Sequence, residues 1–169
     1  MISMHLACAK DGAFGMSNGT LPWGSFPEEL ELFFGSLYPN RHVLVGGNTW
    51  NSLPQSAKDR IVETIVEAGA IVHTVTSAEQ LDAILETSVN DITEFQCIGG
   101  AYIINLILDN HYDKIDAFHM SLIEGGWPAD IYLKPFNEIA PGFRAYNRII
   151  VVRASDNTRA RHFSLERIK

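Results

Sequence analysis

One acidic residue, Glu29, lies where its carboxyl group could do chemistry. Pro27 suits the first turn of a helix because its fixed φ is already helical. In that helix Glu29 shares a side with Leu30 and Phe33. At the mouth of an apolar pocket, desolvation would raise its pKa and suit it to proton chemistry or to holding a protonated heterocycle. The alternative is an ordinary first-turn acid that points to water.

Two strand-to-helix junctions carry adjacent glycines that could admit a ligand. They are Gly46-Gly47-Asn48-Thr49 and Gly99-Gly100-Ala101-Tyr102, each after an apolar, strand-like run. Glycines let a ligand approach the backbone, and free N–H groups at a helix start can bind phosphate. Tight turns use the same residues, so either junction alone is weak evidence. The pair suits a dinucleotide, although neither has the Gly-x-Gly-x-x-Gly spacing of a Rossmann domain.

The segment from Lys10 to Gly24 contains four glycines and ends in a Pro-Trp pair, Pro22-Trp23. A glycine-spaced loop of this length inside a small domain is usually functional and often acts as a lid. The alternative is a plain flexible connection. Pro22 and Pro27 restrict the backbone around Trp23, so this end of the loop is expected to be rigid.

Composition bounds the class of protein. The chain has 169 residues, 46% hydrophobic and 20% charged, which suits a single domain with a full core. Its net charge of −7 and scattered Lys and Arg argue against a nucleic-acid surface. Cys8 and Cys97 are expected to be buried free thiols, and the six histidines show no metal-ligand spacing. Without a leader peptide or an apolar run of membrane-spanning length, we expect a cytoplasmic protein.

Strands and helices alternate along the chain. Strands are expected at 1–9, 42–45, 70–76, 94–98 and 115–123, with helices at 27–38, 55–68, 103–108 and from Ser77 onward. In the 55–68 helix, Ile61, Ile65 and Ala68 form the apolar stripe. The chain ends in a hairpin that pairs 149–152 with 162–165 across Asp156-Asn157. We predict an α/β fold in one domain, residues 1–169: a mixed, mostly parallel twisted sheet with flanking helices and a C-terminal antiparallel hairpin.

At this level of detail the chain resembles the dihydrofolate reductase family over nearly its whole length. The motifs that carry the resemblance are the opening strand with Ala7, the loop residues Asp11, Gly15-Met16 and Asn18, the run Leu21-Pro22-Trp23 with Glu29-Leu30 and Phe33, the junctions Val45–Trp50 with Ser52-Leu53 and Ile98-Gly99-Gly100, and Ser121 and Asp130. Each motif is weak alone, but five in register are strong evidence.

The resemblance implies that the protein transfers a hydride from NADPH to 7,8-dihydrofolate, giving 5,6,7,8-tetrahydrofolate, and that it is an antifolate target. The implied catalytic residues are Glu29, Ser121 and Trp23. The implied substrate-binding residues are His5, Leu30, Phe33, Leu53, Arg60 and Ile98, although His5 and His119 also suit packed strand positions. The implied cofactor-binding residues are Ala7, Phe14, Gly15, Asn18, Gly46, Gly47, Asn48, Thr49, Gly99, Gly100, Ala101, Tyr102 and Ile103.

Further expectations follow from the same resemblance. It implies a cis peptide bond between Gly99 and Gly100, and Asp130 is expected to support the mobile loop. Glu29 would bind the pterin, and the raised pKa would promote protonation at N5, with water carrying the proton. No metal, nucleic acid or membrane partner is implied, and we expect a monomer.

Three departures from the family pattern concern the cofactor and the substrate tail. Gly47 stands where many members have an Arg that contacts cofactor phosphate, which leaves the preference for NADPH over NADH open. Ile104 stands where many have a Tyr beside the nicotinamide. The segment between Leu53 and Ala70 suggests a helix instead of a Pro-rich loop. Arg60 in it either binds the glutamate carboxylate of folate or is a solvated helix Arg, with equal weight.

Two other functions fit parts of the pattern. A pyrimidine reductase of riboflavin synthesis would use the glycine junctions without the Pro-Trp loop and the pocket acid. A non-catalytic protein could keep the fold for ligand binding or assembly, and the changes at Gly47 and Ile104 allow this. Packing alone does not require Glu29, Ser121 and Trp23 together, which favours dihydrofolate reduction.

Overall fold

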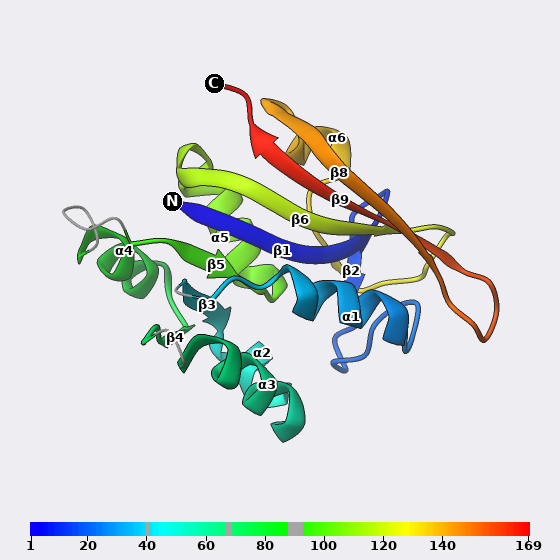
Figure 1. Cartoon of the computed structure of the whole chain (residues 1–169), viewed down its shortest axis with the longest axis horizontal. Coiled ribbons are helices and arrows are strands. Elements are labelled where there is room, and N and C mark those ends of the chain that lie inside the picture. Colours follow the sequence, from blue (N-terminus) through cyan, green and yellow to red (C-terminus); the bar gives the residue numbers. More distant parts are fainter. Residues whose placement is uncertain (40, 67–68, 88–92) are drawn as a thin grey trace. The chain divides into compact units, whose positions relative to one another are not determined.

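The computed structural model describes residues 1–39, 41–66, 69–87 and 93–169, which form two compact units. Unit 1 comprises residues 1–3 and 37–115, and unit 2 comprises residues 4–36 and 116–169. Strand β1 (Ile2–Ala9) therefore begins in unit 1 and continues in unit 2 (Figure 1).

Unit 1 is built on three parallel strands. Strand β3 (His42–Gly46) lies between β4 (Val72–Val75) and β5 (Phe95–Cys97) and pairs with both in parallel. Residues 43–45 of β3 are fully buried, as expected where helices cover both faces of a parallel sheet. The helices of this unit are α2 (Gly47–Ser52), α3 (Gln55–Val66), α4 (Ala78–Thr87), α5 (Ala101–Asn110) and the 3₁₀ turn η1 (Tyr112–Lys114).

The helix expected at 55–68 forms as α3, and it buries the predicted stripe. Ile61 and Ile65 are 1% and 2% exposed, because residues four apart share one face of a helix. The third predicted stripe residue, Ala68, lies outside the described residues. Cys97 in β5 and Cys8 in β1 are buried free thiols, as the sequence predicts, and burial raises the pKa of each to about 12.

Unit 2 contains helix α1 (Pro27–Ser36) and antiparallel strands. Strand β9 (Arg159–Arg167) lies between β6 (Ile115–Ile123) and β8 (Phe143–Val152), and a short helix, α6 (Phe136–Ile139), precedes β8. The 10–24 segment, expected to be a loop throughout, contains strand β2 (Ala13–Gly15), which pairs with β7 (Ile131–Tyr132). This pairing joins residues more than 100 positions apart, so local sequence did not predict it.

The C-terminal hairpin forms, but its predicted register is wrong by three residues. Val152 stands opposite Arg159, and Ile149 stands opposite His162. The turn spans six residues: the N–H of Arg153 donates to the carbonyl of Thr158 at 2.8 Å, and Asn157 adopts a φ of 61°. Pairing therefore starts immediately after this turn, at Arg159 rather than at His162.

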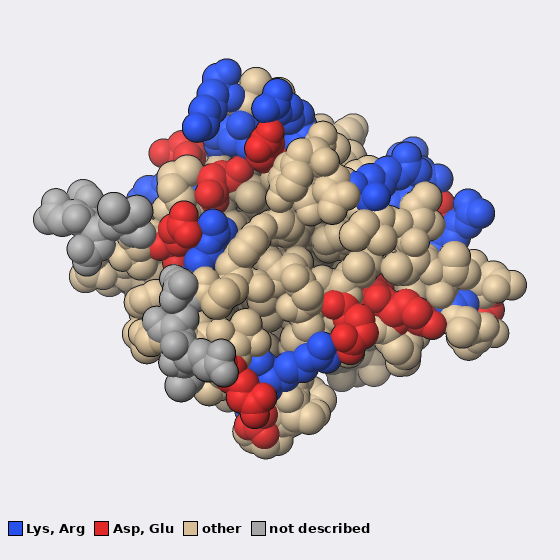
Figure 2. Space-filling view, in the orientation of Figure 1, with Lys and Arg blue, Asp and Glu red and all other residues tan. Residues whose placement is uncertain are grey.

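Hydrogen bonding gives the strand order β4-β3-β5-β1-β6-β9-β8, a mixed sheet that is parallel in unit 1 and antiparallel at the C-terminal end. The predicted fold class is thus confirmed. On the face shown in Figure 2, Lys and Arg side chains drawn in blue and Asp and Glu side chains drawn in red both reach the surface. None of the described helices has both the length and the apolar character needed to span a membrane.

Candidate functional site

The glycine junctions of unit 1 come together around one pocket. The Gly46 N–H donates to the Gly99 carbonyl at 2.8 Å, which joins the end of β3 to the segment after β5. The pocket has a volume of about 160 Å³. It is lined by Gly46, Gly47, Asn48, Thr49, Val75, Thr76, Gly100 and Tyr102. Six of these eight residues are among the cofactor contacts expected from the sequence; of the other two, Val75 ends β4 and Thr76 follows it.

Two of these glycines have no room for a side chain. A Cβ at Gly100 would lie 2.4 Å from the Thr49 hydroxyl oxygen, and one at Gly47 would lie 2.8 Å from the Thr76 methyl carbon. The peptide between Gly99 and Gly100 is cis, as the resemblance implies. The first turn of α5 follows with no side-chain cap at Gly100, so its N–H groups are available to a ligand.

Other candidate residues of unit 1 lie away from this pocket's lining. Ile103 is fully buried in α5, so only its backbone could reach a cofactor. Ile104, at the position of the family's Tyr, is also buried, at 1% exposed. Leu53 and Ile98 are half-buried, and Arg60 lies exposed on α3.

The acid of unit 2 has the environment that its sequence setting predicts. Burial raises the pKa of Glu29, and a hydrogen bond from Ser121 opposes part of this rise because it favours the charged form. Ser121 is fully buried on β6. On α1, Leu30 is 49% exposed and Phe33 is half-buried, which leaves apolar surface beside the carboxyl group. A partly desolvated carboxyl takes up a proton at a higher pH than an exposed one, which suits it to proton chemistry.

His5 belongs to an aromatic cluster on the same unit, and both expectations for it remain compatible with its position. Its ring is 1% exposed, stacks on His119 with 4.9 Å between centroids, and meets the Phe33 ring edge-on at 6.4 Å. Its Nδ1 lies 2.9 Å from the Ser36 hydroxyl oxygen. His5 is thus packed within a strand and also contacts the ring of a predicted substrate residue.

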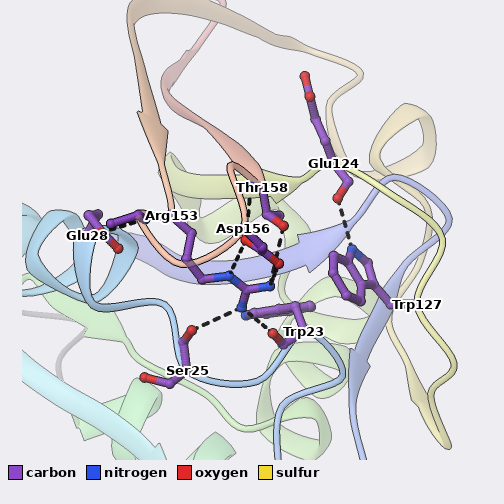
Figure 3. Close-up of polar contacts among 9 residues, drawn as sticks. Trp23, Ser25, Glu28, Glu124, Trp127, Arg153, Asp156 and Thr158 are labelled. Carbon is purple, nitrogen blue, oxygen red and sulfur yellow. Dashed lines mark hydrogen bonds and ion pairs between the residues drawn. The ribbon is translucent and has the colours of Figure 1, made fainter.

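Trp23 is held by an arginine that sequence reasoning missed. The Arg153 guanidinium donates to the carbonyl of Trp23 and, at 3.0 Å, to that of Ser25 (Figure 3). Its Nε and Nη2 also donate to the Asp156 carboxylate at 2.9 and 2.8 Å. Arg153 is only 8% exposed and packs over the Phe26 ring at 5.3 Å. A basic residue at the end of a strand gives no signal of a contact 130 positions away.

The Trp23 side chain is 4% exposed, and its indole N–H is buried without a hydrogen-bond partner among the described residues. Buried polar groups are almost always paired in native proteins. An unpaired donor therefore fits a site that a polar ligand group or a water molecule completes.

The loop before Trp23 is attached to the segment before β7. The Asp130 carboxylate accepts from the backbone N–H of Ser17 at 3.1 Å and from its hydroxyl at 2.9 Å, which lowers the pKa of Asp130. The contact expected from the resemblance is therefore present. Of the predicted cofactor residues in this unit, Ala7 and Phe14 are half-buried, Gly15 is buried and Asn18 is exposed.

Removing this attachment should loosen the loop without unfolding the protein. We expect Asp130→Ala to increase backbone amide exchange at residues 13–18 and to leave exchange in β8 and β9 unchanged, because only an exposed contact is lost. Hydrogen–deuterium exchange with mass spectrometry measures both regions in one experiment. Unchanged protection at Ser17 would show that the Asp130 contact does not hold the loop.

The predicted residues thus divide between the two units. Unit 1 holds Leu53, Arg60, Ile98 and the glycine junctions, whereas unit 2 holds His5, Ala7, Phe14, Gly15, Asn18, Trp23, Glu29, Leu30, Phe33 and Ser121. Unit 1 contains the backbone pocket, and unit 2 contains the Glu29 carboxyl with its hydrogen-bond partner Ser121.

Comparison with known proteins identifies the family. Residues 1–164 match the dihydrofolate reductase family. The chain is 37% identical over 65 residues to the dihydrofolate reductase of Escherichia phage T5, covering 37% of this chain and 36% of that protein. It is 30% identical over 128 residues to dihydrofolate reductase type A10 of Escherichia coli, covering 72% and 65%. The chain thus spans less than two thirds of the length of either relative.

A solved structure has the same fold. It is the dihydrofolate reductase from Enterococcus faecalis complexed with NADP(H) and RAB-propyl, which aligns with a TM-score of 0.64 over 100% of this chain and 97% of its own at 13% identity. Because the family match extends over nearly all of the sequence, this chain belongs to the dihydrofolate reductase family.

Proposed function

We propose that this protein reduces 7,8-dihydrofolate to 5,6,7,8-tetrahydrofolate with NADPH as the reductant. The observation that carries the proposal is the Glu29 carboxyl, whose pKa burial raises and which hydrogen-bonds to the buried Ser121. Membership of the family supports the activity. A packing role does not explain a half-buried acid beside exposed apolar surface.

In the proposed reaction, the reduced nicotinamide supplies the hydride that C6 of the pterin receives. Glu29 binds the amino group and N3 of the pterin, and its raised pKa favours the proton uptake that N5 requires, with water carrying the proton. Ser121 orients the carboxyl group through its hydroxyl. Trp23 anchors the end of the 10–24 loop, and its unpaired indole N–H is available to the substrate or to an ordered water.

The cofactor residues are proposed for each unit separately. In unit 1 the glycine pocket and the uncapped start of α5 suit phosphate and sugar groups, with Gly46, Gly47, Asn48, Thr49, Gly99, Gly100, Ala101, Tyr102 and the Ile103 backbone as contacts. In unit 2 the backbones of Ala7 and Phe14 would hold the nicotinamide carboxamide, and Gly15 and Asn18 belong to the loop that excludes water.

The substrate residues are proposed on the same basis. Leu30 and Phe33 on α1 offer the exposed apolar surface that a pterin and its benzoyl group need, and His5 backs the Phe33 ring. Within unit 1, Leu53 and Ile98 are proposed separately as apolar substrate contacts. Arg60 is proposed to bind the glutamate carboxylate, and its exposed position on α3 leaves it accessible to an anion.

The direct test is the fall of reduced-nicotinamide absorbance when dihydrofolate is added, with NADPH and NADH compared. Turnover dependent on both substrates supports the proposal. Tight antifolate binding without turnover would favour a binding protein that keeps the reductase fold. The absence of both turnover and antifolate binding would exclude the folate function.

Restoring an arginine at position 47 should change the cofactor preference, provided that the methyl group beside it is removed. We expect Gly47→Arg with Thr76→Ser to raise the NADPH:NADH ratio of kcat/KM about tenfold, because the guanidinium adds a charge-assisted contact to the 2′-phosphate. Gly47→Arg alone should give a smaller gain, since the new Cβ meets the Thr76 methyl carbon at 2.8 Å. Thr76→Ser alone is the control, and an unchanged ratio in the double variant would contradict the expectation.

We also propose that residues 1–169 act as one functional domain and that the protein works as a monomer in the cytoplasm. The family match over residues 1–164 supports the first point. Two free thiols with raised pKa values suit a reducing compartment. Sedimentation velocity at micromolar concentration tests the oligomeric state, and a dimer there would contradict the proposal.

A further inference from the structure

A buried histidine lies directly behind the Ser121 hydroxyl. In the antiparallel pairing of β6 with β9, Ser121 stands opposite His162, and its hydroxyl oxygen lies 2.9 Å from His162 Nδ1. Ser121 is fully buried and His162 is 6% exposed. The same hydroxyl is the hydrogen-bond partner of the Glu29 carboxyl. Ser121 therefore joins the acid of α1 to an imidazole on β9.

The donors and acceptors of this chain fix one arrangement when Glu29 is ionised. A carboxylate only accepts, so the Ser121 hydroxyl must donate to it. The Ser121 oxygen then accepts from Nδ1–H of His162, which selects one tautomer of the neutral imidazole. Burial lowers the pKa of His162, which keeps the ring neutral at ordinary pH.

The arrangement reverses when Glu29 takes up a proton. The carboxylic acid can donate to the Ser121 oxygen, Ser121 can donate to Nδ1, and the imidazole then carries its proton on Nε2. If an apolar residue replaced His162, the Ser121 hydroxyl would lose the acceptor to which it donates when Glu29 is protonated. Hydrogen bonds in such a chain strengthen one another, so the His162 N–H stabilises the ionised acid through Ser121.

Other titratable groups share this face of unit 2, but none takes the place of His162. His119 lies two residues before Ser121, and its Nδ1 is 3.2 Å from the Ser164 hydroxyl on β9. His5 on β1 stacks on His119, and Glu166 on β9 pairs with Arg144 at 2.8 Å. The residue of β8 opposite His162 is Ile149, which is apolar.

We propose that His162 is a positioning residue, which fixes the direction of the Ser121 hydroxyl and thereby sets how Glu29 holds its proton. The catalytic consequence of this inference rests on the proposed reductase function. The hydrogen-bond relay itself, Glu29–Ser121–His162, does not require turnover, so it can be tested on the protein without substrate.

The first test uses the unaltered protein. Long-range ¹H–¹⁵N spectra distinguish the two tautomers of a neutral histidine. At a pH well above the Glu29 titration we expect His162 to carry its proton on Nδ1. A proton on Nε2 under these conditions would overturn the proposal, because Ser121 would then donate to His162 rather than to Glu29. This result is independent of whether the chain reduces dihydrofolate.

The second test measures the Glu29 titration by ¹³C NMR of its carboxyl carbon. We expect His162→Phe to raise the Glu29 pKa by about half a unit, because the ionised acid loses part of its support. His162→Asn, which keeps an N–H donor near the Nδ1 position, should restore most of the original value. His119→Phe removes a comparable buried His–Ser pair but keeps the hydrogen bond between His162 and Ser121, so it should leave the Glu29 titration unchanged.

A double-variant cycle separates the relay from a general packing effect. In a Ser121→Ala background the link is absent, so adding His162→Phe should shift the Glu29 pKa no further. An equal shift with and without Ser121, or no shift in His162→Phe alone, would overturn the proposal. If the enzyme turns over, the pH profile of kcat should move in parallel with the NMR titration. An NMR shift without turnover would instead count against the reductase function only.

Discussion

We expect Glu29→Gln to lower kcat for dihydrofolate reduction about 10²- to 10⁴-fold at neutral pH, the range for loss of a group that assists proton transfer. The amide keeps the size of the carboxyl group but cannot take up or release a proton. The residual rate should also lose its dependence on pH. In the unaltered protein kcat should fall as pH rises through the raised pKa of Glu29, because the acid form disappears. Steady-state assays across a pH series measure both effects.

The same variant should be more stable than the unaltered protein at neutral pH, which separates a chemical loss from a folding defect. Because burial raises the folded-state pKa of Glu29, the folded protein binds more protons than the unfolded chain between the two values. Stability is therefore lost as pH rises through this window, and a neutral Gln avoids the loss. Full activity in Glu29→Gln, or a lower Tm at neutral pH, would contradict this assignment. NADPH binding should change little.

The second large effect is expected at Arg153. We predict that Arg153→Met lowers the free energy of unfolding by about 3 kcal/mol, because the carbonyls of Trp23 and Ser25 lose a charged donor and are left in a poorly solvated place. The Met side chain keeps the apolar contact with the rings, so the change isolates the guanidinium. Urea unfolding followed by circular dichroism measures the difference.

A matched control is available on β8. Arg148 is exposed and lies over the Phe163 ring at 5.9 Å, so Arg148→Met removes a cation–π contact and a charge without taking a donor from the Trp23 loop. It should cost less than about 1 kcal/mol. Equal losses of unfolding free energy in both variants would show that the hydrogen bonds from Arg153 to the two carbonyls do not add to stability. Arg153→Lys should recover only part of the loss, since one ammonium group cannot bind Asp156 and both carbonyls together.

The predictable parts of the site are those encoded in short stretches of sequence. Glu29, Leu30 and Phe33 could be placed on one side of α1 from helical spacing alone, and the structure gives Glu29 the expected raised pKa. The glycine pairs predicted both junctions because turn chemistry is local. The buried positions Ile61 and Ile65 of α3 could likewise be predicted, because apolar residues recur there at helical spacing.

The parts that sequence could not provide depend on pairing between distant segments. Nothing near Arg153 indicates that it reaches the Trp23 carbonyl, and nothing near His162 indicates that a Ser stands opposite. Such contacts can be predicted only when the register of strand pairing is known, and the predicted register of the hairpin was wrong by three residues. The register is set by a turn of six residues that backbone hydrogen bonds close. The residue types in this segment are compatible with several turn lengths, so they do not specify this one.

The surroundings of Arg153 also have a consequence for the tryptophan fluorescence of the protein. Of the three tryptophans, Trp23 and Trp127 belong to unit 2, and the Arg153 guanidinium lies 5.9 Å from the Trp127 ring and bonds to the Trp23 carbonyl (Figure 3). Trp50 belongs to unit 1, beneath the ammonium group of Lys58 at 5.7 Å. Intrinsic fluorescence therefore carries a separate signal for each unit. A protein with only Trp50 and a protein lacking only Trp50 would follow the melting of the two halves independently, without any added label.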